Sequence, residues 1–237
     1  MSDPWIEIAC GSNVLALQTT CGPEPKPYGS FNLGLHVGDD ESAVMNNRSH
    51  LADRFGREVY FPNQVHGIDV IRVQKGSAVV SADAVVTEEL NCPIGIMTAD
   101  CLPVLFASPK LIGAAHAGWR GLVSGVLEQT LEEFPDPSEV TIWLGPCIGP
   151  DAFEVGPEVM DAFVSKNLAW SRYFSRVVDS DRSMADLQGI AFNLLENLGV
   201  ATINALDACT YNDPTRWYSY RRSGTTGRMA SCIMRTE

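Results

Sequence analysis

The chain has 237 residues, of which 45% are hydrophobic, a size and composition typical of a folded protein with a substantial core. Lysine and arginine number 17 against 29 acidic residues, and the resulting formal net charge of −12 argues against a general affinity for nucleic acid or for an anionic membrane surface. We therefore expect neither nucleic acid nor a membrane as a partner, and any anionic substrate must be met by a local basic cluster.

The N-terminal segment Met1–Glu7 has no basic region followed by an apolar run, and no stretch approaches the roughly 18 apolar residues of a membrane span. The 7 cysteines are an odd number and have no paired spacing, which is more typical of reduced thiols than of a disulfide framework. These features predict a cytoplasmic protein in which most cysteines, including Cys147, are small core residues.

Apolar and β-branched runs separated by turn signals predict many strands. We expect them at Val14–Thr19, Val70–Val73, Ala84–Thr87, Ile94–Thr98, Val104–Ala107, Ile112–Ala115, Val140–Leu144 and Ala230–Met234. Clear helical periodicity runs from Leu122 to Phe134, ending at Pro135, and from Met184 to Leu198.

In the second helix, Ser183 and Asp186 occupy the places of a capping box, and Gly199 is expected to stop the helix. Weaker periodicity predicts helices at 41–55, closed by Gly56, and at 157–164, with Pro157 in the first turn. Clusters of proline and glycine at 22–29 and 145–150 predict loops. Strands unevenly interleaved with helices, without a repeat or a long linker, indicate one α+β domain over residues 1–237.

Three residues in the middle of the chain suit a catalytic metal site. His66 lies in a loop, Cys101 follows the strand at 94–98, and His116 comes where the strand at 111–115 ends. Two histidines and a cysteine without a fourth protein ligand suit Zn²⁺, because the open position can hold a water, a hydroxide or a substrate atom. The three form no contiguous zinc motif, so residue chemistry alone leaves open a core cysteine with two ordinary histidines.

Asp100 is the carboxylate nearest to Cys101 in the sequence. It could take part in catalysis by orienting His66 or His116 as a hydrogen-bond acceptor, or it could cap a backbone amide in a turn. Asp83 and Asp69 rank lower because no spacing singles them out.

A basic cluster near the C-terminus is a candidate anion site. Arg221 and Arg222, followed by Thr225–Arg228, bring three guanidinium groups and two hydroxyls together in an acidic chain. Guanidinium groups suit phosphate recognition, so we expect Arg221 and Arg222 to bind substrate. The alternative is a solvated surface turn.

Five segments of the chain resemble the signatures of the YfiH/laccase-domain family. They are Asn63–Gly67, Thr98–Val104, Ala115–Gly121, Leu144–Gly149 and Tyr220–Arg228. The stretch Phe31–Asp40 is similar to that family too, so the resemblance covers nearly the whole chain.

The resemblance implies a single-domain, four-layer α/β/β/α fold shared with the cytotoxic necrotizing toxins, and a zinc ion held by His66, Cys101 and His116, which would also be catalytic. It implies a small-molecule substrate: purine nucleosides, including methylthioadenosine, cleaved with phosphate, and adenosine deaminated. By analogy, Asn32 and Arg48 would contribute to the nucleoside pocket, although residue chemistry alone would place Arg48 on the surface.

Three alternatives stay open. Older names in the family refer to copper-dependent polyphenol oxidases or laccases, but multicopper oxidation needs many histidines, and this chain has 4 with no His-x-His pair. Copper could still occupy a Cys/His site. A metal-free Cys101–His116 pair could instead hydrolyse an amide, for example in a cell-wall precursor. A module that only binds a nucleotide or such a precursor is the third.

Overall fold

Two β-sheets lie face to face at the centre of the structure, which is a computed structural model describing residues 3–11, 13–23 and 27–236. Residues 24–26 of the loop expected at 22–29 lie outside the described residues. The first sheet has four strands, each antiparallel to its neighbours. In spatial order they are β1 (Trp5–Ile8), β2 (Val14–Thr19), β13 (Met229–Arg235) and β5 (Ile94–Thr98).

The second sheet has six strands and is mixed, since its two outer pairs are parallel and its inner pairs are antiparallel. In spatial order they are β12 (Thr202–Ala205), β8 (Thr141–Leu144), β6 (Leu102–Ala107), β7 (Ile112–Ala117), β4 (Ala84–Thr87) and β3 (Val70–Arg72). The four strands β4 to β7 are almost wholly apolar and buried on both faces, as expected for strands in the middle of a layered protein.

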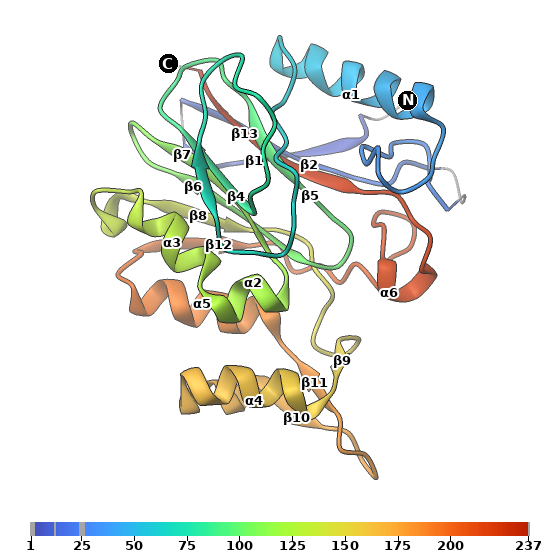
Figure 1. Ribbon diagram of the computed structural model, residues 1–237, viewed down its shortest axis with the longest axis vertical. Coiled ribbons are helices and arrows are strands. Elements are labelled where there is room, and N and C mark those ends of the chain that lie inside the picture. Colours follow the sequence, from blue (N-terminus) through green and yellow to red (C-terminus); the bar gives the residue numbers. More distant parts are fainter. Residues whose placement is uncertain (1–2, 12, 24–26, 237) are drawn as a thin grey trace.

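Helices cover the outer face of each sheet, which gives the four layers α/β/β/α (Figure 1). Ile96 and Ile233 of the first sheet pack against Leu105 of the second in the central core. On the outer face of the first sheet, Leu51 of α1 (Glu41–Phe55) packs near Leu17. The outer face of the second sheet carries three helices, α2 (Trp119–Ser124), α3 (Val126–Glu132) and α5 (Leu187–Asn197). The fold expected from the family resemblance is confirmed.

A smaller unit extends from this core at the bottom of Figure 1 and packs into the core cluster below the second sheet through Val155, Phe163 and Trp170. It contains a three-stranded antiparallel sheet, one α-helix and one 3₁₀ helix. They are β9 (Glu154–Val155), α4 (Pro157–Lys166), η2 (Leu168–Tyr173), β10 (Phe174–Arg176) and β11 (Ser183–Ala185). The remaining short helices are η1 (Pro137–Glu139) and α6 (Tyr220–Ser223). None of the helices in the described ranges is long and apolar enough to cross a membrane.

Two helices differ from the expected ones. The periodic segment from Leu122 to Phe134 is broken at Gly125, which adopts φ 111° and separates α2 from α3. The helix expected from Met184 begins later, because Ser183–Ala185 pairs as β11. Asp186 is therefore the N-cap itself and accepts a 2.8 Å hydrogen bond from the amide of Gly189, and no capping box with Ser183 forms.

Asp186→Ala should lower the free energy of unfolding by about 1 kcal/mol, because the first turn of α5 loses its side-chain acceptor. Asp186→Asn keeps an oxygen at the same place and should stay close to the parent. Urea denaturation followed by circular dichroism measures both. Equal losses in the two variants would show that the cap does not stabilise α5.

Candidate metal centre and substrate pocket

The pairing of β6 with β7 places Cys101 next to His116. Leu102 pairs with Ala117 and Pro103 with His116, so Cys101, which precedes β6, comes opposite Gly118. His116 thus lies within β7, as its second-to-last residue, and not after the strand as the sequence suggested. A Cβ atom on Gly118 would lie 3.0 Å from Cys101 Sγ and 3.1 Å from His66 Cδ2. Gly118 therefore leaves the space that the two ligand side chains occupy.

Asp83 brings the third ligand to this place. Its carboxylate is fully buried and accepts hydrogen bonds from three consecutive amides, those of Val65 (3.1 Å), His66 (2.9 Å) and Gly67 (2.6 Å). Asp83 Oδ1 also lies 2.8 Å from Nδ1 of His116. One carboxylate thus fastens the His66 loop and the His116 ring to each other, and its contact with Nδ1 leaves Nε2 of His116 free for a metal.

The charge of Asp83 is well supported by these partners. Burial raises the pKa of this carboxyl, but the hydrogen bonds from His116 and the loop amides, together with the charge of His116, lower it by more, so the net shift is downward. His66 has φ 62°, a left-handed conformation that is uncommon outside glycine. The backbone amides of Val65 and Gly67, on either side of His66, donate hydrogen bonds to Asp83 and hold His66 in this conformation.

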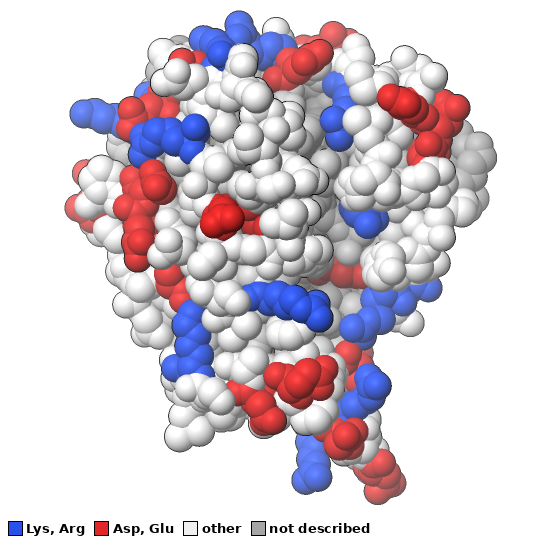
Figure 2. Space-filling model, viewed as in Figure 1, with Lys and Arg blue, Asp and Glu red and all other residues white. Residues whose placement is uncertain are grey.

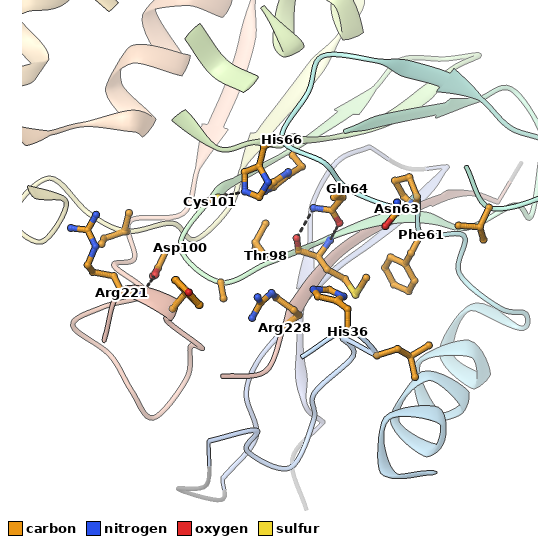
Figure 3. A pocket seen from close by; sticks show the side chains of 18 of the residues that line it. His36, Phe61, Asn63, Gln64, His66, Thr98, Asp100, Cys101, Arg221 and Arg228 are labelled. Carbon is orange, nitrogen blue, oxygen red and sulfur yellow. Dashed lines mark hydrogen bonds between the residues drawn. The ribbon is translucent and has the colours of Figure 1, made fainter. Parts of the chain in front are cut away.

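Gln64 gives the same loop a second attachment. Its side-chain amide donates a 2.8 Å hydrogen bond to the carbonyl of Met97, and its side-chain oxygen accepts one of 2.8 Å from the Met97 amide (Figure 3). The side chain therefore pairs with the free edge of β5 as a neighbouring strand would.

His66, Cys101 and His116 form the one group in the described part of the chain whose ligand atoms could hold a metal ion, and these atoms all lie within 4.8 Å of one another. Cys101 Sγ is 3.9 Å from His66 Nε2. Zinc bonds of about 2.0 to 2.3 Å in a tetrahedral arrangement put two ligand atoms roughly 3.5 Å apart. The thiol and imidazole donors thus fit a zinc ion with only small side-chain adjustments.

The charges of the group favour a thiolate. Burial raises the pKa of Cys101, but the charges of His116 and His66 and their hydrogen bonds lower it by more, to about 6. For His116, burial lowers the pKa, while the Cys101 thiolate and the bond to Asp83 raise it to about 9.

These three residues line a pocket of about 860 Å³. Its other lining residues include apolar side chains and several cations. Besides His66 and Cys101, the lining residues labelled in Figure 3 are His36, Phe61, Asn63, Gln64, Thr98, Asp100, Arg221 and Arg228. The outer surface is unlike this interior, since acidic and basic side chains are intermixed on the face shown in Figure 2 and form no broad basic area there.

Asp100 does not orient a histidine. Its Oδ1 accepts a 2.6 Å hydrogen bond from the Thr210 hydroxyl, and its Oδ2 accepts one of 2.7 Å from the amide of Arg221. The structure gives the second of the two roles considered for it, capping of a backbone amide, with the carboxylate buried in the floor of the pocket. Asp83 orients His116 instead. The sequence signal was a single aspartate directly before the buried strand β4.

The candidate substrate-binding residues divide into two pairs. Arg48 and Arg221 line the pocket, and Arg221 donates to the carbonyl of Glu154 at 2.8 Å. Arg222 is not among the lining residues, because its guanidinium donates to the backbone carbonyls of Thr210, Tyr211 and Trp217. Asn32 is buried outside the lining, where its side chain accepts hydrogen bonds from the amides of Gly34 and Arg228.

Residues 14–236 match the family described as multi-copper polyphenol oxidoreductase laccase. The chain belongs to this family. A relative from Haemophilus influenzae, named purine nucleoside phosphorylase, is 42% identical over 229 residues, which cover 93% of this chain and 94% of the relative. A relative from Escherichia coli, named purine nucleoside phosphorylase YfiH, is 44% identical over 213 residues, 87% of either chain.

The fold is also similar to solved structures. A crystal structure of a Neisseria meningitidis protein aligns with a TM-score of 0.94 and 37% identity, covering 99% of this chain and 100% of that one. The resemblance to the YfiH/laccase-domain family inferred from the sequence is thereby confirmed.

Asp83→Asn should weaken zinc binding by about 10- to 100-fold, because the His66 loop and the His116 ring lose their shared acceptor. Competition against a chromophoric chelator measures the affinity. Asp69→Asn is the matched control, since Asp69 is exposed and bonds to the amides of Asp83 and Ala84 only through its backbone carbonyl. Equal zinc affinity in the two variants would contradict the role given to Asp83.

Proposed function

We propose that this protein is a zinc-dependent purine nucleoside phosphorylase. The observation that carries the proposal is the set of three metal-ligand side chains that open onto a pocket of about 860 Å³. Relatives 42% and 44% identical along most of the chain carry the name purine nucleoside phosphorylase, which supports the same assignment. The catalytic residues in this proposal are His66, Cys101 and His116.

In the reaction, a phosphate oxygen bonds to the anomeric carbon of the ribose while the bond from that carbon to the purine nitrogen breaks. The bonding electrons leave with the purine, which takes up a proton, and the products are ribose 1-phosphate and the free base. A zinc ion held by one thiolate and two neutral imidazoles would supply a net positive charge to this reaction.

The protein's own side chains position the reactants. Phe61, Met97, Ile148 and Phe153 give the pocket an apolar wall suited to a purine ring. Asp83 fixes the orientation of His116, and Gln64 fixes the loop that carries His66. The carboxylate of Asp100 accepts a hydrogen bond from the backbone amide of Arg221 and so holds Arg221 at the rim.

Zinc suits these ligands better than the copper clusters that the family description names. Multicopper oxidation needs several coppers held largely by histidines, whereas the whole sequence has 4 histidines. Among the described residues only one three-ligand group is present. Copper can compete for such a site, because Cu²⁺ binds most nitrogen and sulfur ligands more tightly than Zn²⁺.

The proposal extends to two further purine activities in the same pocket. Adenosine deamination would replace the exocyclic amino group with an oxygen from water, releasing ammonia. Methylthioadenosine would be cleaved by phosphate as inosine is, with its methylthio group against exposed apolar side chains of the rim, Leu35 and Val79.

We expect the purified protein to carry about one zinc per chain and to convert inosine to hypoxanthine only when phosphate is supplied. His66→Ala, Cys101→Ala and His116→Ala should each lose zinc and phosphorolysis together. Elemental analysis and a coupled assay for the free base measure the two quantities. His50→Gln is the control, because His50 packs on Trp5 and Phe31 away from the pocket. Full zinc content in all three alanine variants would contradict the proposal.

A second candidate function is amide hydrolysis. It is favoured by the order of contacts in the site, in which Cys101 lies beside His116 and His116 is bonded to Asp83. A cysteine beside a histidine that a carboxylate orients is the arrangement of cysteine hydrolases. Such an enzyme would act on a cell-wall precursor or another amide.

His66→Ala separates the two candidates. Under the proposed phosphorylase function, this variant loses all turnover of inosine, since the metal site needs His66. Under the hydrolase alternative, amide cleavage survives His66→Ala and is abolished by Cys101→Ala. Both variants should be assayed with inosine plus phosphate and with a panel of small amides. Cys101-dependent amide cleavage that persists without His66, with nucleosides left intact, would favour the hydrolase.

A further inference from the structure

The wall of the pocket formed by the first sheet and α1 is basic. Arg48 and Arg228 are half-buried, and His36 lies beside Arg228 at the rim (Figure 3). All three line the pocket that also holds the His66, Cys101 and His116 group. In the part of the chain that the structure describes, no carboxylate forms an ion pair with Arg48 or Arg228. Partly buried guanidinium groups that form no close ion pair with a carboxylate are unusual in a chain whose net charge is −12.

The fold holds Arg228 in a defined place. Thr98 pairs with Met229 in the first sheet, so Arg228, which directly precedes β13, lies beside the end of β5. Cys101 follows three residues after that end of β5. The Arg228 amide donates a 2.8 Å hydrogen bond to the Asn32 side chain. A Cβ atom on Gly34 would lie 2.8 Å from Cγ of Arg228, so glycine at this position leaves the space for the arginine side chain.

Arg48 is tied to the same segment. From α1, its Nε donates a 2.9 Å hydrogen bond to the carbonyl of Leu33, and its guanidinium lies over the Phe61 ring at 5.3 Å. Arg228 uses one terminal nitrogen on the carbonyls of Thr226 and Gly227, at 3.0 Å each. Each guanidinium has five N–H donors, so both keep donors that these contacts do not use.

The hydroxyl of Thr98 supplies an independent sign of a ligand. Thr98 is 2% exposed and lines the pocket, and its Oγ1 has no hydrogen-bond partner among the described residues. Buried hydroxyls nearly always have a partner. A group that reaches this wall with acceptor oxygens would satisfy the Thr98 hydroxyl and the unused guanidinium donors together.

We infer that Arg48, Arg228 and the Thr98 hydroxyl form a subsite for a phosphate group, on the wall of the pocket contributed by the first sheet and α1. Arginine matches tetrahedral oxyanions with short, charge-assisted hydrogen bonds. The phosphate group is either free inorganic phosphate or the phosphoryl group of a nucleoside monophosphate. The first source rests on the proposed phosphorylase function, in which inorganic phosphate is the second substrate; binding of either can be measured without turnover.

This subsite lies at other arginines than those expected from the sequence to recognise phosphate. The sequence singled out Arg221 and Arg222, but Arg222 is occupied by three backbone carbonyls and Arg221 lies exposed at the rim. Arg228, the third arginine of the same segment, faces the pocket together with Arg48.

Titration calorimetry with inorganic phosphate and with inosine 5′-monophosphate tests this inference on the purified, metal-containing protein. Arg48→Gln and Arg228→Gln should each raise the dissociation constant of the probe that binds by roughly tenfold or more, because each removes charge-assisted hydrogen bonds. Gly34→Ala should weaken the same probe without changing any charge, because the new methyl group displaces the Arg228 side chain. Arg176→Gln, on an exposed strand of the small sheet, is the control of equal charge and should change it by less than about twofold.

The two probes separate the sources. A loss of inorganic phosphate binding, with a matching rise in the KM for phosphate and an unchanged KM for inosine, identifies free phosphate. A loss confined to inosine 5′-monophosphate identifies an attached phosphoryl group. The subsite then stands, and the proposed phosphorylase function is decided separately by whether phosphate-dependent release of hypoxanthine from inosine is observed. The inference is overturned if neither probe binds the parent protein, or if Arg48→Gln, Arg228→Gln and Gly34→Ala bind as the parent does. Should one glutamine variant fail to fold, the other and Gly34→Ala decide the question.

Discussion

The Asp83 carboxylate is fully buried and accepts hydrogen bonds from three consecutive backbone amides and from one imidazole. A carboxylate without such partners would be very costly to bury, so its charge can be accommodated only when the loop at 65–67 lies against the end of β7. The positions of His66 and His116 therefore depend on each other, because both are fixed by the same carboxylate. These two candidate metal ligands come from distant parts of the sequence, yet they share a single point of attachment.

The seam between the two sheets explains where the pocket forms. β5 belongs to the first sheet and β6 to the second, and only Ala99–Cys101 joins them. Asp100 makes this crossing with φ 94° and is held on both carboxylate oxygens. Cys101 and His116 thus lie on the side of the second sheet, while Thr98 and Arg228 lie on the side of the first. A substrate in the pocket would contact both sheets at once.

Much of the fold and of the candidate site could be predicted from the sequence. The features that could not be predicted depend on contacts between distant parts of the chain. Strong apolar runs predicted the buried strands, and Asp186 was visible as a capping residue, although the chain before it forms a strand because β9 and β10 are there to pair with it. The three candidate ligands, His66, Cys101 and His116, could be picked out by residue type and family resemblance. Asp83 could not, because an aspartate before a strand has no local sign that three amides from residues 65–67 will surround it.

The arginines show the same limit. Arg221, Arg222 and Arg228 cannot be told apart in the sequence. The ends of α6 and β13 determine that Arg222 donates to backbone carbonyls while Arg228 faces the pocket. Only the family resemblance placed Arg48 in the pocket. The pattern of α1 gives no sign that distinguishes this arginine from a surface residue. Its contact with Leu33 depends on a loop that no periodicity describes.

The pairing of Gln64 with Met97 has a consequence beyond the site. β5 is the last strand of its sheet, and an open strand edge can recruit a strand from another molecule. Gln64 occupies the amide and carbonyl of Met97, and Tyr60 accepts a 3.0 Å hydrogen bond from the amide of Gly95 further along the same edge. The segment that carries His66 therefore also shields this edge from self-association. Resistance to aggregation and the integrity of the pocket are consequently maintained by the same few hydrogen bonds.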